Sequence, residues 1–169
     1  GIFPVLKHFP GHGRSKKDSH LELPRLKVSF KNLVQSDMKS FRYLKDEIFV
    51  MLAHIVYENV DKNIATYSQK LINELLIKKM KFNGLIITDD LSMKALKGSI
   101  EERTIKSYDA GCDIVLYCDA KLNEMKTIYE NSRYINTKKL EYLKEYKKNL
   151  YKSKCTNSTK MNEILYSKK

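Results

Sequence analysis

Ile86-Ile87-Thr88-Asp89-Asp90-Leu91-Ser92-Met93 is an apolar segment that runs directly into two adjacent carboxylates. A short apolar run that is bounded by polar residues predicts a buried strand. Functional side chains of α/β folds gather at the C-terminal ends of parallel strands. The segment therefore predicts a parallel sheet, and it predicts a site at one edge of that sheet.

Three more apolar segments, at residues 2–6, 48–53 and 113–117, predict strands of the same kind as residues 85–88. Their apolar residues are continuous and do not alternate with polar ones, as expected for strands of a parallel sheet that is covered on both faces. The strands begin roughly 30 to 45 residues apart, close to the repeat of an eight-stranded (β/α) barrel of about 250 residues.

Helical patterns lie between the predicted strands. One begins at Thr66-Tyr67-Ser68-Gln69, which has capping-box spacing, and Gly84 ends that segment before the next strand. A second covers residues 99–110 and stops at Gly111, while a third begins near Ser36. The predicted order is four successive β/α units, which is half of a barrel.

Half of a barrel leaves its first and last strands with unpaired edges and exposes one apolar face of the sheet. We therefore expect either a doubly wound open sheet or a partner that supplies the other half. The chain begins with Gly1 in place of Met, so the sequence is also consistent with a leader or a larger N-terminal region that is absent from it.

The 169 residues carry a formal net charge of +12. Most of the excess lies in residues 121–169, which hold thirteen basic and five acidic side chains. No recognition motif of aromatic and basic residues accompanies this charge, so we interpret it as compositional bias and expect no nucleic-acid partner. The sequence also has no segment typical of a membrane span or a signal peptide.

Three cysteines without a C-x-x-C pair do not form a disulfide framework, and they indicate a reducing compartment, which we expect to be the cytoplasm. We also expect two regions. Residues 1–120 form the half-barrel, and residues 121–169 form an outer helix with a basic helical C-terminal extension.

Three of the four histidines lie in a Gly- and Pro-containing loop after the first predicted strand, within Lys7-His8-Phe9-Pro10-Gly11-His12-Gly13 and Asp18-Ser19-His20. Folding alone does not require this cluster. Metal binding is one interpretation, but the spacing of these histidines matches no standard zinc motif, so we expect no metal. From the residues alone, His20 is as well explained as an ordinary loop histidine.

Both segments belong to a set of five motifs whose order resembles that of the family 3 β-N-acetylhexosaminidases. The other three are Ala53-His54-Ile55-Val56-Tyr57, Thr88-Asp89-Asp90-Leu91-Ser92-Met93 and Ala110-Gly111-Cys112-Asp113. The similarity covers about residues 3–120. It implies a (β/α)8 TIM barrel of which this chain is the C-terminal half, about strands five to eight. An acidic and an arginine side chain that the family supplies from its N-terminal half have no counterpart here.

The resemblance also implies roles for five residues. Asp89 would be the nucleophile of a retaining mechanism, although an aspartate there could instead cap the following helix. His20 would be the general acid and then the general base. Asp18 would hold the ring nitrogen of His20 that does not exchange protons with the substrate or water. Lys7 and His8 would bind sugar hydroxyls, whereas a solvated lysine and a packed histidine are the simpler interpretation.

The activity implied is that of a retaining exo-β-N-acetylglucosaminidase without a cofactor. Its substrate would be an N-acetylglucosaminyl muropeptide from peptidoglycan recycling. A phosphorylase is a variant of this activity, because a neutral histidine repels phosphate less than a carboxylate does. A half-barrel without activity that binds sugar, or that pairs with an N-terminal half-barrel chain or with its own copies, is the alternative.

Overall fold

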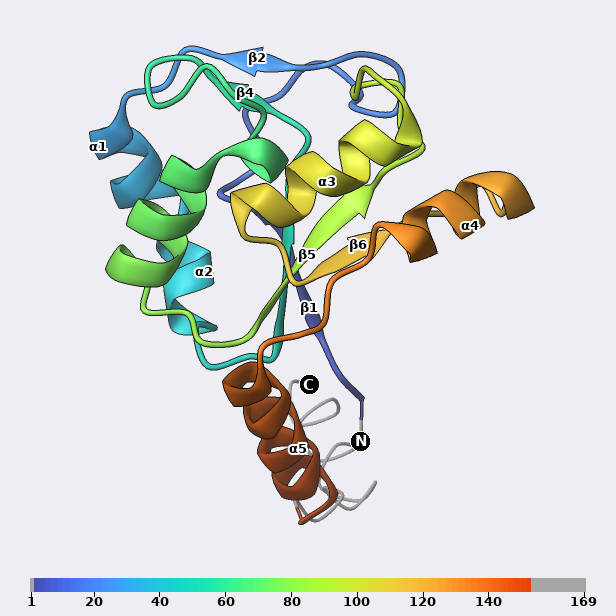
Figure 1. The fold of residues 1–169 in the computed structure, drawn as a ribbon. Coiled ribbons are helices and arrows are strands. Elements are labelled where there is room, and N and C mark those ends of the chain that lie inside the picture. The colour runs from blue at the N-terminus through green and yellow to red at the C-terminus, as the bar shows by residue number, and fades with distance from the viewer. Residues whose placement is uncertain (1, 153–169) are drawn as a thin grey trace, which may run out of the picture.

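The computed structural model describes residues 2–152, which form a four-stranded parallel sheet with helices packed against it (Figure 1). The strand order is β1-β3-β5-β6, and each neighbouring pair is parallel. The strands are β1 (Val5–Phe9), β3 (Phe49–Leu52), β5 (Leu85–Asp90) and β6 (Ile114–Leu116). All four predicted strands are present, and their C-terminal ends lie at the same edge of the sheet.

Helical segments connect the strands. Between β1 and β3 lie α1 (Phe30–Asn32), the π-helix η1 (Leu33–Asp37) and α2 (Lys39–Tyr43). The 3-10 helix η2 (Ala65–Tyr67) and the π-helix η3 (Leu71–Lys79) precede β5, while α3 (Ile100–Ala110) precedes β6. Two helices follow β6, namely α4 (Leu122–Glu130) and α5 (Thr137–Lys152).

Two short strands that the sequence did not predict, β2 (Arg25–Leu26) and β4 (Val56–Tyr57), pair in parallel within the loops that follow β1 and β3. They tie these two loops together beside the C-terminal edge of the main sheet, at the top of Figure 1.

The core lies between the helices and one face of the sheet. Leu71, Leu75 and Leu76 of η3 are fully buried, as are Val50 and Leu52 of β3. Side chains on the opposite face are less covered.

On that opposite face, Phe49, Met51 and Ile87 are only half-buried, and Val5 is 38% exposed. This sheet is therefore not doubly wound. With helices burying one face and an apolar second face left open, it has the architecture of a partial barrel.

Local signals explain two helix starts, one of them differently from the prediction. The Ser99 hydroxyl accepts a hydrogen bond from the Glu102 N–H at 3.1 Å and caps α3, and Gly111 ends that helix with φ = 113°. Before η3, Ser68 is the capping residue, because its hydroxyl accepts from the Leu71 N–H at 3.0 Å. Thr66, the predicted cap, makes other contacts that are described below.

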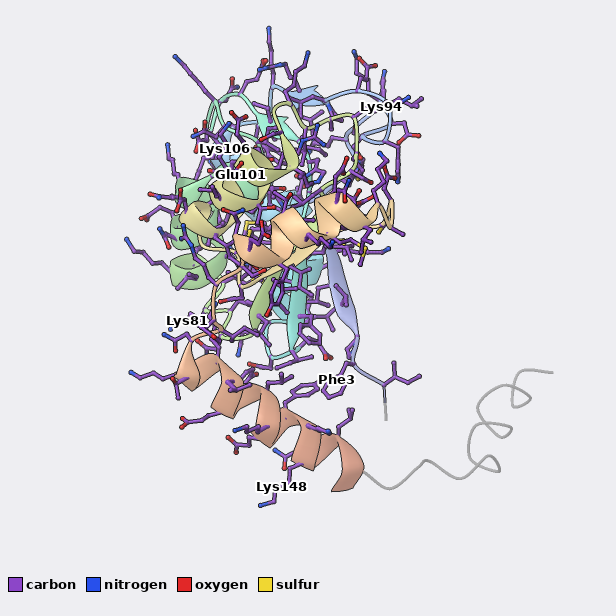
Figure 2. All side chains as sticks on the ribbon, turned by 45° about the vertical axis from the view of Figure 1, so that its right-hand side comes forward. Phe3, Lys81, Lys94, Glu101, Lys106 and Lys148 are labelled. Atoms are coloured by element: carbon purple, nitrogen blue, oxygen red, sulfur yellow. The ribbon has the colours of Figure 1, made fainter. Side chains whose placement is uncertain are left out.

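Helix α5 lies across the N-terminal ends of the strands, away from the edge where the strands end (Figure 1). The Tyr146 ring stacks on Phe3 at 5.9 Å, and the Tyr146 hydroxyl donates to Glu47 at 2.6 Å. Figure 2 shows Phe3 beside this helix. The predicted helical extension is thus docked on the sheet through one face. The segment beyond residue 152, which is the end of the predicted extension, lies outside the described residues.

Candidate active site

The loop after β1 carries two of the predicted site residues, Asp18 and His20, and it is anchored at its start. The Tyr57 hydroxyl donates to the Gly11 carbonyl oxygen at 2.7 Å, and the Arg14 Nε donates to Asp37 at 2.8 Å. Gly11 has φ = 145°, and a Cβ at this position would lie 2.8 Å from Asp37 Cβ. Only glycine fits this turn without displacing its neighbour.

Asp89 of β5 and His8 of β1 approach each other at the C-terminal edge of the sheet, although β3 lies between their strands. Asp89 lies near the C-terminal end of β5, its side chain is 14% exposed, and its Oδ2 is 3.5 Å from His8 Nε2. That distance exceeds the usual N–H···O range, so the contact is loose. Burial lowers the pKa of His8 below its ordinary value, against the opposing effect of the Asp89 charge.

Lys7 and His8 lie within β1, inside the strand that was predicted to end before them. The Lys7–His8 and Phe9–Pro10 peptide bonds are both cis. Lys7 is exposed. Both residues therefore occupy the strand end next to the site, as the sequence predicted, although the strand is shifted by three residues.

Asp90 is held by its surroundings. Its Oδ1 accepts from the Ser92 N–H at 2.9 Å and from the Cys118 N–H at 3.0 Å, and its Oδ2 accepts from the Ser92 hydroxyl. These bonds connect the end of β5 to the loop after β6. Asp89 accepts only one hydrogen bond, from the Asp90 N–H at 2.9 Å, among the described residues. Asp90 is thus a structural carboxylate, whereas Asp89 Oδ2 accepts no hydrogen bond among the described residues and has only the loose contact with His8.

Asp18 and His20 form a second pair. Asp18 Oδ1 lies 2.8 Å from His20 Nδ1 and accepts from the His20 backbone N–H at 2.9 Å. These two bonds lower the pKa of Asp18. The His20 side chain is 75% exposed, and within residues 2–152 it has no hydrogen bond or ion pair with Asp89. Its charge nevertheless reaches His8, whose pKa it helps to lower.

The five predicted site residues are therefore arranged as two separate pairs, His8 with Asp89 and Asp18 with His20. Lys7 is next to His8 in β1. His54, which the sequence did not place among the site residues, follows β3 and is fully buried. Its Nδ1 lies 2.7 Å from the Thr66 hydroxyl, and its Nε2 lies 3.1 Å from the Asp90 carbonyl oxygen. The sequence signal that could have identified His54 as a site residue is its position directly after a strand.

The loops that follow Asp18 and Asp89 also border a cavity of about 840 Å³, whose lining includes Leu23, Tyr67 and Ala95. None of the five predicted site residues lines this cavity. Across residues 2–152, no group of three or more His, Cys, Asp or Glu side chains is arranged to hold a metal ion. In the same part of the chain, no helix has the length and apolarity needed to cross a membrane.

A parallel β/α sheet with a carboxylate at one strand end and a histidine–aspartate pair in a loop at the same edge has the arrangement of a segment of a β/α-barrel enzyme. The comparison with protein families agrees, because residues 1–146 match the family model described as the glycosyl hydrolase family 3 N terminal domain. The chain belongs to glycosyl hydrolase family 3.

Similar proteins carry names from the same family. A Beta-hexosaminidase of Methylobacillus flagellatus is 38% identical over 123 residues, which are 70% of this chain and 35% of the relative. The chain thus spans about a third of the length of the curated relatives it matches.

Solved structures are similar in fold. The crystal structure of CbsA from Thermotoga neapolitana has a TM-score of 0.73 and 32% identity, and the match covers 97% of this chain and 40% of that one. NagZ from Neisseria gonorrhoeae in complex with N-trifluoroacetyl-D-glucosamine has a TM-score of 0.71 and 35% identity, with 82% and 41% covered. These similarities confirm the predicted family and the predicted partial barrel.

Proposed function

We propose that this chain supplies the nucleophile and the acid/base of a retaining β-N-acetylglucosaminidase. One observation carries the proposal: the Asp89 carboxylate lies at the C-terminal edge of the sheet with one oxygen outside any hydrogen bond among the described residues, beside a loop that holds a histidine–aspartate pair. The names of the relatives, and the sugar derivative bound to the related NagZ, support a hexosaminide substrate.

The reaction takes two steps. Asp89 attacks the anomeric carbon and forms a covalent glycosyl ester, while His20 gives a proton from Nε2 to the departing oxygen. His20 then accepts a proton from water, and the water oxygen displaces Asp89 and releases the sugar. Asp18 keeps the proton on Nδ1 and so leaves Nε2 as the atom that exchanges protons.

Movement of the loop is part of this proposal. His20 is exposed and Asp89 is largely buried, so the loop between Gly11 and His20 has to carry His20 toward the sugar when substrate binds. The loop start is fixed by Tyr57 and Asp37, which confines the movement to the segment that follows Arg14.

Lys7 and His8 are proposed to bind hydroxyl groups of the N-acetylglucosamine ring from β1. The remaining part of the substrate, which we propose to be a muropeptide from peptidoglycan, extends away from Asp89. Arg14 pairs with Asp37 at 2.8 Å, and Lys17 pairs with Glu22 at 2.6 Å. These two basic side chains are therefore not proposed to bind an anionic group of the muropeptide. The free thiols of Cys112 and Cys118 support the proposal of a cytoplasmic enzyme.

We propose that an N-terminal half-barrel completes the site. Strands β1 and β6 are the outer strands of the described sheet. Beside β6, helix α4 presents an apolar row in which Leu122 is 64% exposed, Met125 48% and Tyr129 82%. This exposed row and the open sheet face are the surfaces that another half-barrel would cover.

The test is hydrolysis of a chromogenic β-N-acetylglucosaminide by the chain alone and by the chain mixed with the N-terminal half of a related β-hexosaminidase. We expect Asp89→Asn to reduce turnover by roughly 10³-fold or more, because the nucleophile is lost. Asp46→Asn is the control, since that carboxylate is 80% exposed and lies at the opposite edge of the sheet. Equal turnover by the wild-type chain and Asp89→Asn would refute the assignment.

The phosphorylase remains the second candidate, and the observation that favours it is the Asp18–His20 pair standing where most glycosidases have a carboxyl group. Adding phosphate to the same assay separates the two activities. A hydrolase releases free sugar, whereas a phosphorylase diverts product to sugar 1-phosphate.

A further inference from the structure

His54 is a buried polar residue that connects three segments of the chain. It follows β3, contacts Thr66 of η2 through Nδ1, and contacts the Asp90 carbonyl oxygen at the end of β5 through Nε2. Its side chain is fully buried. A buried imidazole needs hydrogen-bond partners for its ring nitrogens, and one of the two partners of His54 lies at the end of the strand that carries the predicted nucleophile.

Counting protons defines the state of the ring. A carbonyl oxygen only accepts, so the nitrogen that faces Asp90 has to carry hydrogen. A neutral imidazole has one N–H, so Nδ1 then accepts from the Thr66 hydroxyl, and the 2.7 Å distance fits this bond. The Thr66 hydroxyl also lies 3.2 Å from the Ala53 carbonyl oxygen, which is the weaker of its two acceptors.

The charges around the ring act in both directions. Burial lowers the pKa of His54 and favours the neutral ring, and the nearby His8 acts in the same sense. The carboxylates of Asp89 and Asp90 and the Asp90 carbonyl oxygen oppose this effect. The desolvation of a fully buried ring is the largest of these influences, so the ring is neutral with its proton on Nε2.

Asp90 transmits this contact to Asp89. Its carbonyl oxygen accepts from His54 and from the Met93 N–H at 3.2 Å, and its carboxylate is held by Ser92 and Cys118. The remaining polar group of Asp90, its N–H, donates to Asp89 Oδ1. The orientation of the Asp89 carboxylate thus depends on Asp90, whose carbonyl oxygen, N–H and carboxylate are all hydrogen-bonded.

From this chain of contacts we propose that His54 is a positioning residue for Asp89. Its Nε2–H holds the Asp90 carbonyl, and Asp90 in turn holds the nucleophile with its free oxygen toward the substrate. The inference rests on the proposed function of Asp89, and it adds a requirement: the neutral tautomer with the proton on Nε2.

Two substitutions separate the contacts of the ring. The amide of His54→Asn reaches the position of Nδ1 but not that of Nε2, so it can contact Thr66 and leaves the Asp90 carbonyl without its donor. The amide of His54→Gln reaches farther and can donate to that carbonyl. We expect His54→Asn to lower kcat by about 100-fold with little change in KM, as for a misplaced catalytic group. His54→Gln should recover most of that loss.

These kinetic constants are measured on the chain in whichever form is active in the hydrolysis assay, and they are corrected for the folded fraction with Asp46→Asn as the control. Two variants with equal kcat, both close to that of the wild type, would reduce His54 to a structural residue and overturn the inference. Such variants would lower only the melting temperature.

A spectroscopic measurement tests the inference without requiring turnover. Long-range ¹H–¹⁵N spectra of the labelled chain at pH 7 should show His54 neutral and protonated at Nε2. A proton on Nδ1, or a charged ring, would overturn the inference even if hydrolysis is observed. If the wild-type chain shows no hydrolysis with or without the N-terminal half, the proposed function fails, and the tautomer alone still decides the proposed state of His54.

Discussion

Asp89 and Asp90 are adjacent residues of the same type, and their surroundings give them different roles. Asp90 accepts three hydrogen bonds from Ser92 and Cys118, which fix its carboxylate in the turn after β5. Asp89 accepts one, from its neighbour's N–H. A carboxylate with unfilled acceptor sites at the catalytic edge can attack a substrate, whereas a saturated one can only support the backbone.

The buried His54 and the half-buried His8 predict a pH dependence of stability. The pKa values of His8 and His54 are lowered in the folded chain, chiefly by burial. Below the unfolded pKa of about 6.5, the unfolded chain therefore binds more protons than the folded chain. The contribution of the two neutral histidines to the free energy of unfolding is complete above about pH 6.5. It is lost as the pH falls through their lowered pKa values in the folded chain.

We therefore expect the free energy of unfolding, measured with urea, to decrease between pH 7.5 and pH 5.5. His54→Gln should make this decrease smaller, because the glutamine does not titrate. The expectation fails if the wild-type chain and His54→Gln change in parallel across this range.

The contact between Asp18 and His20 could be predicted locally, because the two residues are two positions apart. Their roles and that of Asp89 came from the family resemblance and stay predictions. The contacts of His54 join residues that are 12 and 36 positions apart, and no local pattern contains that information.

At the scale of elements, Gly84 shows how tightly the turn before β5 is packed. A Cβ there would lie 2.3 Å from the Ile48 carbonyl oxygen and 2.7 Å from Phe82 Cζ. We expect Gly84→Ala to reduce the free energy of unfolding by about 2–3 kcal/mol, because the backbone has to move. Gly13→Ala is the control, since a Cβ there meets nothing within 4 Å. Urea unfolding of both variants is the measurement, and equal effects would contradict this account of the turn.

The start of η3 shows where local prediction of elements ends. Thr66 and Ser68 both carry hydroxyls that can cap a helix, and spacing favoured Thr66. The structure uses the Thr66 hydroxyl for His54 and the Ala53 carbonyl, so Ser68 caps the helix instead. By contrast, the start and end of α3 were predicted correctly, because Ser99 and Gly111 act through contacts with their own helix or the residues next to it.

At the scale of the whole molecule, the two edges of the sheet have different tasks. The C-terminal edge carries the candidate site, and α5 covers the N-terminal edge through Tyr146 and Lys139, which pair with Glu47 and Asp113. In β/α barrels the N-terminal edge contributes stability and the C-terminal edge contributes chemistry. The docked basic helix is therefore part of the scaffold.

The exposed row on α4 predicts where the proposed N-terminal half-barrel would bind. Met125 is 48% exposed and lies between Leu122 and Tyr129 on the uncovered face of this helix. Met125→Lys should leave the free energy of unfolding of the chain within about 0.5 kcal/mol, as for other exposed positions. It should weaken binding to the N-terminal half of a related β-hexosaminidase by roughly tenfold or more, because a charge would be buried at the interface.

Calorimetric titration measures that affinity, and sedimentation of the chain alone shows whether its copies associate through the same face. Lys126→Ala is the control on the neighbouring exposed position. Equal binding by Met125→Lys and Lys126→Ala would show that the α4 row lies outside the interface. A loss confined to Met125→Lys would place the seam of the barrel beside β6, because α4 follows that outer strand directly.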